Sequence, residues 1–305
     1  MIWKMAAPAL LMTAFLASST SWVGAGSTVW WISLVAFHSR NRPLPNAASA
    51  PVAALFAVLL AVYYVHLARR VDGWQASRTA WWLAGCALVV VTLCSGLGMH
   101  MPASYSAHMT VHMILSMGVP VLLVLGAPLT LVRAAYPAGE FNPRLWAESF
   151  QRSSFVRWIS HPAVSTIQFL VLFYVLYVVE PLYDLMISEH AGHVIMNAVF
   201  LLSGYFYFWE LIGPDEIVGR ASAKVRLAWL WISMPFHLFM GVYLMQLGAV
   251  MGEEFYRSLE LPWNPDLLKV QKDGGGIAWA AGSFQSIGAE SVAHSYSSGA
   301  ARSGG

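Results

Sequence analysis

Six apolar stretches constrain the fold of this chain more than any other feature, because each is close to the ~20 residues that a helix needs to cross ~30 Å of hydrocarbon. Charged residues make up only 10% of the 305 residues, against roughly a quarter in ordinary globular proteins. The sequence therefore predicts an all-α membrane protein, a polytopic transmembrane helix bundle with six clear spans. We place them at about residues 51–68, 80–99, 107–132, 163–183, 191–212 and 227–250.

The basic residues alternate from one loop to the next. Arginines occur in loops 69–79 and 133–160, whereas loops 100–106 and 184–190 contain neither Lys nor Arg. By the positive-inside rule, the first two loops are cytoplasmic and the other two are external. The net charge of +2 is too small for a protein that binds nucleic acid by neutralising phosphates. We expect a multi-pass protein of the plasma membrane, in contact with the lipid bilayer and not with nucleic acid.

The two ends of the chain differ in composition from the predicted bundle domain, residues 51–273. Residues 1–37 have a basic start, a short apolar core and then small residues, which fits a secretory signal peptide and, equally well, an uncleaved anchor helix. Residues 38–50 predict an exposed linker, because they contain several Pro and Arg residues. Residues 274–305 are rich in Gly and Ser with only a short apolar piece, so we expect an atypical, disordered tail.

Histidines at the ends of the spans are the candidate functional residues, because an ionisable group within a membrane is costly and usually marks function. His108 and His112 open the third span four residues apart, which puts both imidazoles on one helix face. His100 closes the second span, and His190 and His193 open the fifth span one turn apart. In the predicted topology, all five histidines lie at the external ends of their helices.

A further histidine and several methionines extend this set. His237 lies near the middle of the sixth span, and Met109 and Met113 repeat the four-residue spacing beside His108 and His112. Imidazole with thioether is a ligand set for soft or borderline metals, copper above all. The alternative is that such histidines are interfacial and that the methionines fill the core. For a single histidine the alternative is the better interpretation, whereas the closely spaced pair favours a metal site.

A series of short motifs runs in order from the third span to the last glycine cluster. In this order they resemble the multi-spanning CtaG-type cytochrome c oxidase assembly proteins of Gram-positive bacteria, over about residues 50 to 281. The resemblance implies a role in maturing the haem–copper oxidase, and it favours His108, His112, His190, His193 and His237 as the site. It also implies a seven-helix bundle with a last span after the glycine motif, where this chain continues as the Gly/Ser-rich tail. The motifs are Ser106-Ala107-His108-Met109-Thr110-Val111-His112-Met113, Val119–Pro128, His161-Pro162, Pro181-Leu182-Tyr183-Asp184, His190-x-x-His193, Met234-Pro235-Phe236-His237 and Gly274-Gly275-Gly276-Ile277-Ala278-Trp279.

Three functions are compatible with these observations. The first is an assembly factor, not an enzyme, that delivers or retains copper for the active-site copper of cytochrome c oxidase and has oxidase subunits as partners. The second is a copper transporter of the plasma membrane, which His237 suggests and for which only His66 and His161 could supply inner ligands. The third is a membrane haem protein, which needs histidine pairs on facing helices at matched depth. We rank them in this order.

Overall fold

We describe a computed structural model of the chain, in which residues 49–136, 143–217 and 219–282 are placed. These residues are helical and contain no strand, so the predicted all-α membrane bundle is confirmed. The predicted signal or anchor segment 1–37, most of the linker and residues 283–305 of the tail lie outside the described residues.

Among the described residues, five helical segments are long and apolar enough to cross a membrane. Four of them correspond to predicted spans within a few residues, and the third predicted span is a longer helical run from Tyr105 to Ala135. The single helices are α3 (Ser49–Ala68), α4 (Ala76–Cys94), α13 (His190–Ile212) and α14 (Ala223–Gln246). The run comprises α6 (Tyr105–Met113), the π-helical turn η2 (Ile114–Gly118), α7 (Val119–Leu125) and α8 (Pro128–Ala135).

The fourth predicted span is broken. It consists of α11 (Pro162–Val178) and α12 (Glu180–Ser188), which meet at an angle of 82°. Pro181 at the start of α12 lacks an N–H and disfavours the helical conformation of the residue before it, so the helix cannot run through. The predicted span 163–183 is therefore bent, and the described residues contain six spans if the bent pair counts as one.

The second predicted span also ends earlier than expected. The helix α4 stops at Cys94, and Ser95, in extended backbone conformation, starts a separate short helix α5 (Gly96–His100) by accepting a hydrogen bond from Leu97 N. The 3-10 turn η1 (Met101–Ala103) follows. Residues 96–99, predicted to complete the second span, instead belong to α5 at the end of the bundle.

The last described helix, α16 (Leu267–Ala281), corrects the predicted boundary of the tail. Asp266 caps its first turn, with Lys269 N donating to Asp266 Oδ1 at 3.0 Å. Residues 274–281 are helical, and Gly274, Gly275, Ala278 and Ala281 are buried. The prediction of a tail from residue 274 is therefore wrong for 274–281. The small side chains of α16 let it approach α14 and α6 closely. Because these small residues do not form a long apolar run, the sequence does not indicate that the helix is buried.

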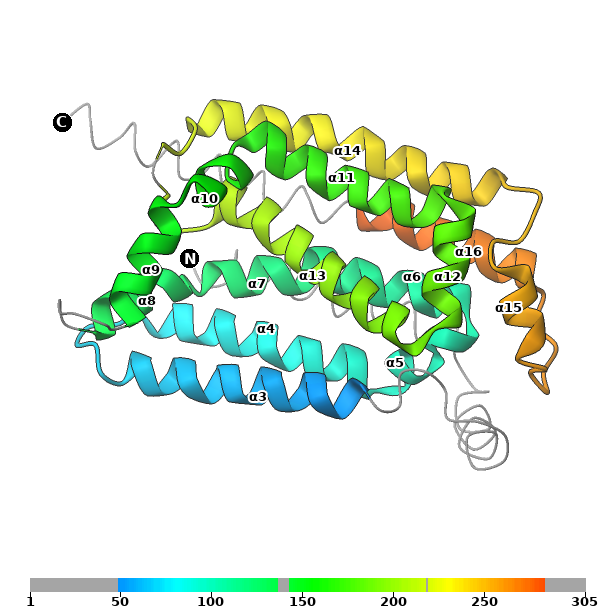
Figure 1. Cartoon of the computed structure of the whole chain (residues 1–305), viewed down its shortest axis with the longest axis horizontal. Helices are drawn as coiled ribbons and strands as arrows, with labels where there is room; N and C mark the ends of the chain where they lie inside the picture. The colour runs from blue at the N-terminus through cyan, green and yellow to red at the C-terminus, as the bar shows by residue number, and fades with distance from the viewer. Residues whose placement is uncertain (1–48, 137–142, 218, 283–305) are drawn as a thin grey trace. The chain divides into compact units, whose positions relative to one another are not determined.

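Short helices mark the two ends of the bundle. Figure 1 shows α8, α9 (Pro143–Arg152) and α10 (Ser154–Ile159) at one end and α5, α12 and α15 (Glu253–Ser258) at the other. The first end carries the Arg-containing loops that we predict to be cytoplasmic, and the second carries the loops that we predict to be external. The N-termini of α6 and α13 both lie at the second end, which brings their histidines to the same depth.

Candidate metal centre

Three of the predicted histidines come together inside the bundle. The ring centroids of His108 and His112 on α6 lie 4.3 Å apart, and those of His108 and His193 on α13 lie 5.9 Å apart. All three side chains have no solvent-exposed surface. The spacing of His108 and His112 thus produces the shared helix face that we expected, and α13 adds a third imidazole to it. We call these three residues the histidine cluster.

Three buried tyrosines lie beside the histidine cluster, and a fourth, Tyr256, lies next to one of them. The ring of Tyr183 lies 5.8 Å from that of His108, and the ring of Tyr177 lies 6.2 Å from it. Tyr105 packs against both tyrosines, and the hydroxyls of Tyr183 and Tyr256 are 3.1 Å apart. These tyrosines were not among the predicted site residues. Tyr177 lies inside the fourth predicted span and Tyr183 in the motif Pro181-Leu182-Tyr183-Asp184, but neither position shows which helix the ring faces.

The hydrogen bonds of the imidazoles indicate which nitrogens are available to a ligand. His193 Nδ1 lies 3.2 Å from the carbonyl oxygen of Glu189, and because a carbonyl only accepts, Nδ1 carries the proton and Nε2 the lone pair. His112 Nδ1 lies 2.6 Å from Tyr177 Oη. His108 has no hydrogen bond on either nitrogen, and Nε2 of His112 and of His193 has none, among the described residues. The side chain of Asn197 on α13 also interacts with that of His112, at a geometry that leaves His112 Nε2 and Asn197 Oδ1 without a regular hydrogen bond among the described residues.

These unpaired nitrogens fit a ligand role better than a packing role. A buried polar atom without a hydrogen bond costs about 1–3 kcal/mol, and the histidine cluster contains several. Two imidazoles on one ion place their ring centroids at most about 6 Å apart, from nitrogen–metal bonds of about 2 Å and the size of the rings. The 5.9 Å separation of His108 and His193 is within this limit. Across the described residues, no three His, Cys, Asp or Glu side chains are placed so that they could together hold a metal ion.

The two predicted methionine ligands are buried at the same level of α6. Met109 is fully buried and Met113 is 3% exposed, and both belong to the main hydrophobic core. Packing alone accounts for this burial, because Met commonly fills irregular gaps in cores. A ligand role for their sulfur atoms therefore stays a prediction.

The other three predicted histidines have no ring contact with the histidine cluster among the described residues. His100 is the partly exposed last residue of α5, with Nδ1 2.8 Å from the carbonyl oxygen of Gly96. His190 is the exposed first residue of α13. His237 is buried on α14, where its ring packs against Phe169 at 5.2 Å and Phe173 at 5.5 Å.

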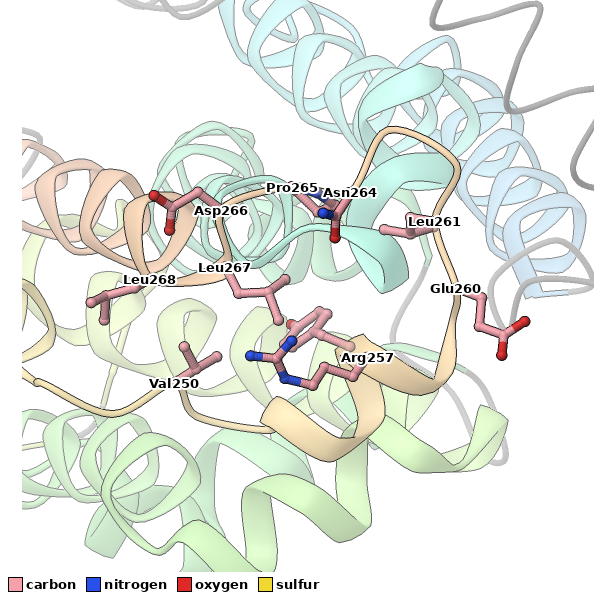
Figure 2. Close-up of a pocket in the computed structure, with 10 residues that line it drawn as sticks. Val250, Arg257, Glu260, Leu261, Asn264, Pro265, Asp266, Leu267 and Leu268 are labelled. Carbon is pink, nitrogen blue, oxygen red and sulfur yellow. The ribbon is translucent and has the colours of Figure 1, made fainter.

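A cavity of about 530 Å³ opens at the same end of the bundle, beside α15 and the start of α16. Figure 2 shows Arg257, Glu260 and Asp266 around it, and Tyr256 also lines it. Arg257 is paired with Glu253 at 2.6 Å. No histidine lines this cavity, so it is separate from the histidine cluster, although Tyr256, which lines it, lies next to Tyr183 beside His108.

The opposite end of the bundle holds a buried ionic network. Arg220 donates to the carbonyl oxygens of Trp209, Glu210 and Gly213 at the C-terminus of α13, where a cation stabilises the helix dipole. Burial lowers the pKa of Arg220 to about 10. Asp215 is fully buried and accepts hydrogen bonds from the N–H and the hydroxyl of Thr130, and burial raises the pKa of its carboxyl above the usual range.

The two histidines that could serve as inner ligands of a transporter do not form a site. His66 is exposed at the end of α3. His161 is also exposed, and its Nδ1 accepts a hydrogen bond from Ala163 N at the start of α11. The transporter alternative therefore gains no support from this end of the bundle.

Comparison with known proteins confirms the resemblance seen in the motifs. The family described as cytochrome c oxidase caa3 assembly factor (Caa3_CtaG) matches residues 58–289. An uncharacterized protein of Mycobacterium leprae is 39% identical over 222 residues, which are 72% of this chain and 34% of the relative. An uncharacterized protein of Mycobacterium bovis is 38% identical over 230 residues, 74% of this chain and 35% of the relative. The chain thus spans about a third of the length of these relatives, and no solved structure matches it significantly.

Proposed function

Because the chain belongs to the cytochrome c oxidase caa3 assembly factor family, we propose that it holds copper in the membrane and passes it to cytochrome c oxidase. Copper is then the cargo of the protein and not its resident cofactor. The protein acts without catalysing a reaction, in the plasma membrane, with one or more oxidase subunits as its partners.

The facing pair of His108 and His193 supports this proposal more than any other observation. Their ring centroids are 5.9 Å apart on two different helices, and each offers an Nε2 without a hydrogen bond among the described residues. Copper binds nitrogen donors more tightly than the other divalent first-row metals do, so a small set of imidazoles can hold it. His112 lies next to His108, with ring centroids 4.3 Å apart, and is the alternative partner of His108 in the proposed site, with Met109 and Met113 as sources of sulfur.

An incomplete ligand set suits a carrier better than a storage site. A closed site with four protein ligands leaves no position for an incoming donor, whereas an open position allows ligand exchange. The surrounding tyrosines exclude water from the imidazoles, and the location at the predicted external end places the cargo near the extracellular side. We propose that a donor group of the oxidase replaces the imidazoles one at a time.

The test is the double substitution His108→Ala with His112→Ala, made in the full chain. Copper is measured in the purified protein and in the oxidase of cells that carry the variant. We expect copper retention and oxidase maturation to be lost. Both imidazoles are fully buried, so their truncation leaves a cavity that lowers stability, and the amount of inserted protein is measured in parallel to separate the two effects. Exposed His161→Ala is the control for a histidine outside the cluster. A fully copper-loaded oxidase in the double variant would contradict the proposal.

A further inference from the structure

We propose that Tyr177 is a positioning residue of the histidine cluster, whose hydroxyl holds the His112 ring so that Nε2 is the nitrogen offered to the cargo. This inference rests on the proposed function. It adds a residue from α11 that the family motifs in the sequence do not include.

The geometry places Tyr177 directly against His112. Tyr177 is fully buried near the end of α11, and its Oη lies 2.6 Å from His112 Nδ1. The ring of Tyr177 also packs against Phe200 of α13 at 6.0 Å, and Phe200 in turn lies 4.3 Å from the His112 ring. The hydrogen bond therefore links two helices and fixes a ring that aromatic contacts already confine.

A hydroxyl suits this position because it can both donate and accept. A neutral imidazole has one N–H and one lone pair. With copper on Nε2, the proton must lie on Nδ1, which then donates to Tyr177 Oη. Without copper, Oη–H can donate to Nδ1 instead. The Glu189 carbonyl that holds His193 only accepts, so it fixes one tautomer, whereas Tyr177 keeps the orientation of His112 in both states.

Partners of this kind change metal binding measurably. A group that hydrogen-bonds the second nitrogen of a ligating histidine fixes the ring and its tautomer, and its removal typically weakens metal binding 10–100-fold. We therefore expect Tyr177→Phe, which removes only the hydroxyl, to weaken copper binding by about 10–100-fold.

Tyr207 provides the matched control. It is also fully buried, and its hydroxyl lies 2.6 Å from Ser233 Oγ. It packs against Phe169 and Phe208 rather than against the histidine cluster. Tyr207→Phe thus removes one short buried hydrogen bond of the same kind, and both variants should lose a similar amount of stability. Only Tyr177→Phe should change copper binding.

The experiment measures Cu(I) affinity of the full chain in detergent by competition with a chromogenic chelator. Raman spectra of the copper-loaded protein report whether copper is on Nδ1 or Nε2. The wild type should show Nε2 binding, and Tyr177→Phe should show weaker binding with both modes. In a His112→Ala background, Tyr177→Phe should change nothing further, because the two residues act as one unit.

The outcomes separate the two proposals. If the wild type binds copper and Tyr177→Phe binds it with the same affinity and the same Raman signature, the positioning role is wrong and the proposed function stands. If Tyr207→Phe weakens binding as much as Tyr177→Phe does, the effect is structural and the inference is also overturned. If the wild type binds no copper, both proposals are wrong.

Discussion

The packing of α16 against α14 leads to the most direct prediction about the fold. Gly275 on α16 faces Gly241 on α14, and a Cβ on Gly275 would lie 2.9 Å from the carbonyl oxygen of Gly241 and 3.0 Å from Met245 N. Both neighbours are backbone atoms and cannot rotate away. A Cβ on the next residue, Gly276, would have no heavy atom within 4 Å. The substitutions Gly275→Ala and Gly276→Ala are therefore a matched pair on one helix.

The size of the effect follows from two opposing contributions. Replacing Gly by Ala within a helix gains about 1 kcal/mol, and this gain is the same at both positions. Overpacking at Gly275 costs about 1–3 kcal/mol, because two backbones must separate by a few tenths of an ångström. We expect Gly276→Ala to be more stable than the wild type and Gly275→Ala to be about 1–3 kcal/mol less stable than Gly276→Ala.

Thermal unfolding of the purified protein in detergent measures this difference. A change of 1 kcal/mol shifts the Tm by about 2–4 °C for a domain of roughly 150–250 residues, so the two variants should differ by several degrees. Equal Tm values for the two alanine variants would refute the close packing of α16 against α14. A loss of stability in Gly276→Ala alone would show that the opposite face of α16 is packed.

Two further predictions concern the ends of the bundle. Burial raises the pKa of Asp215, so the native state binds its proton more tightly than the unfolded state does. The stability of the protein should therefore fall as the pH rises from the ordinary Asp pKa, about 4, through the raised pKa of Asp215. Asp215→Asn should remove this pH dependence, which unfolding curves at several pH values measure. The same pH dependence in Asp215→Asn and the wild type would contradict the prediction. For the topology, a membrane-impermeant thiol reagent added to intact cells should label Ser104→Cys but not Gln75→Cys. Both variants are made in a Cys94→Ser background, because Cys94 is exposed. The reverse labelling pattern would overturn the assignment.

The parts of the fold that could be predicted from sequence are those that depend on local hydrophobicity. The ends of α13 and α14 lie within a few residues of the predicted spans because the length of an apolar helix is set by the bilayer. The helix α16 could not be predicted in this way. Its burial depends on glycines such as Gly275 that admit a neighbouring backbone, and the same glycines predict a flexible tail when they are considered without that neighbour.

The candidate site was predictable to a similar degree. The spacing of His108 and His112 places them on one helix face, which is a property of a single helix. The addition of His193 and the separation of His190 from the cluster depend on how α13 is rotated against α6. The sequence contains no signal for this rotation, because both histidines stand one turn apart at the same helix end.

The break between α11 and α12 connects the fold to the site. On a straight helix, Tyr177 and Tyr183 would be about 9 Å apart along the axis, since each residue adds 1.5 Å. The 82° bend at Val179 instead brings their rings within 5.7 Å of each other and places both beside His108. The proline that prevents a regular fourth span thereby allows one chain segment to supply two walls of the same buried site. A variant that straightens this segment should open the histidine cluster to water even though no histidine is changed.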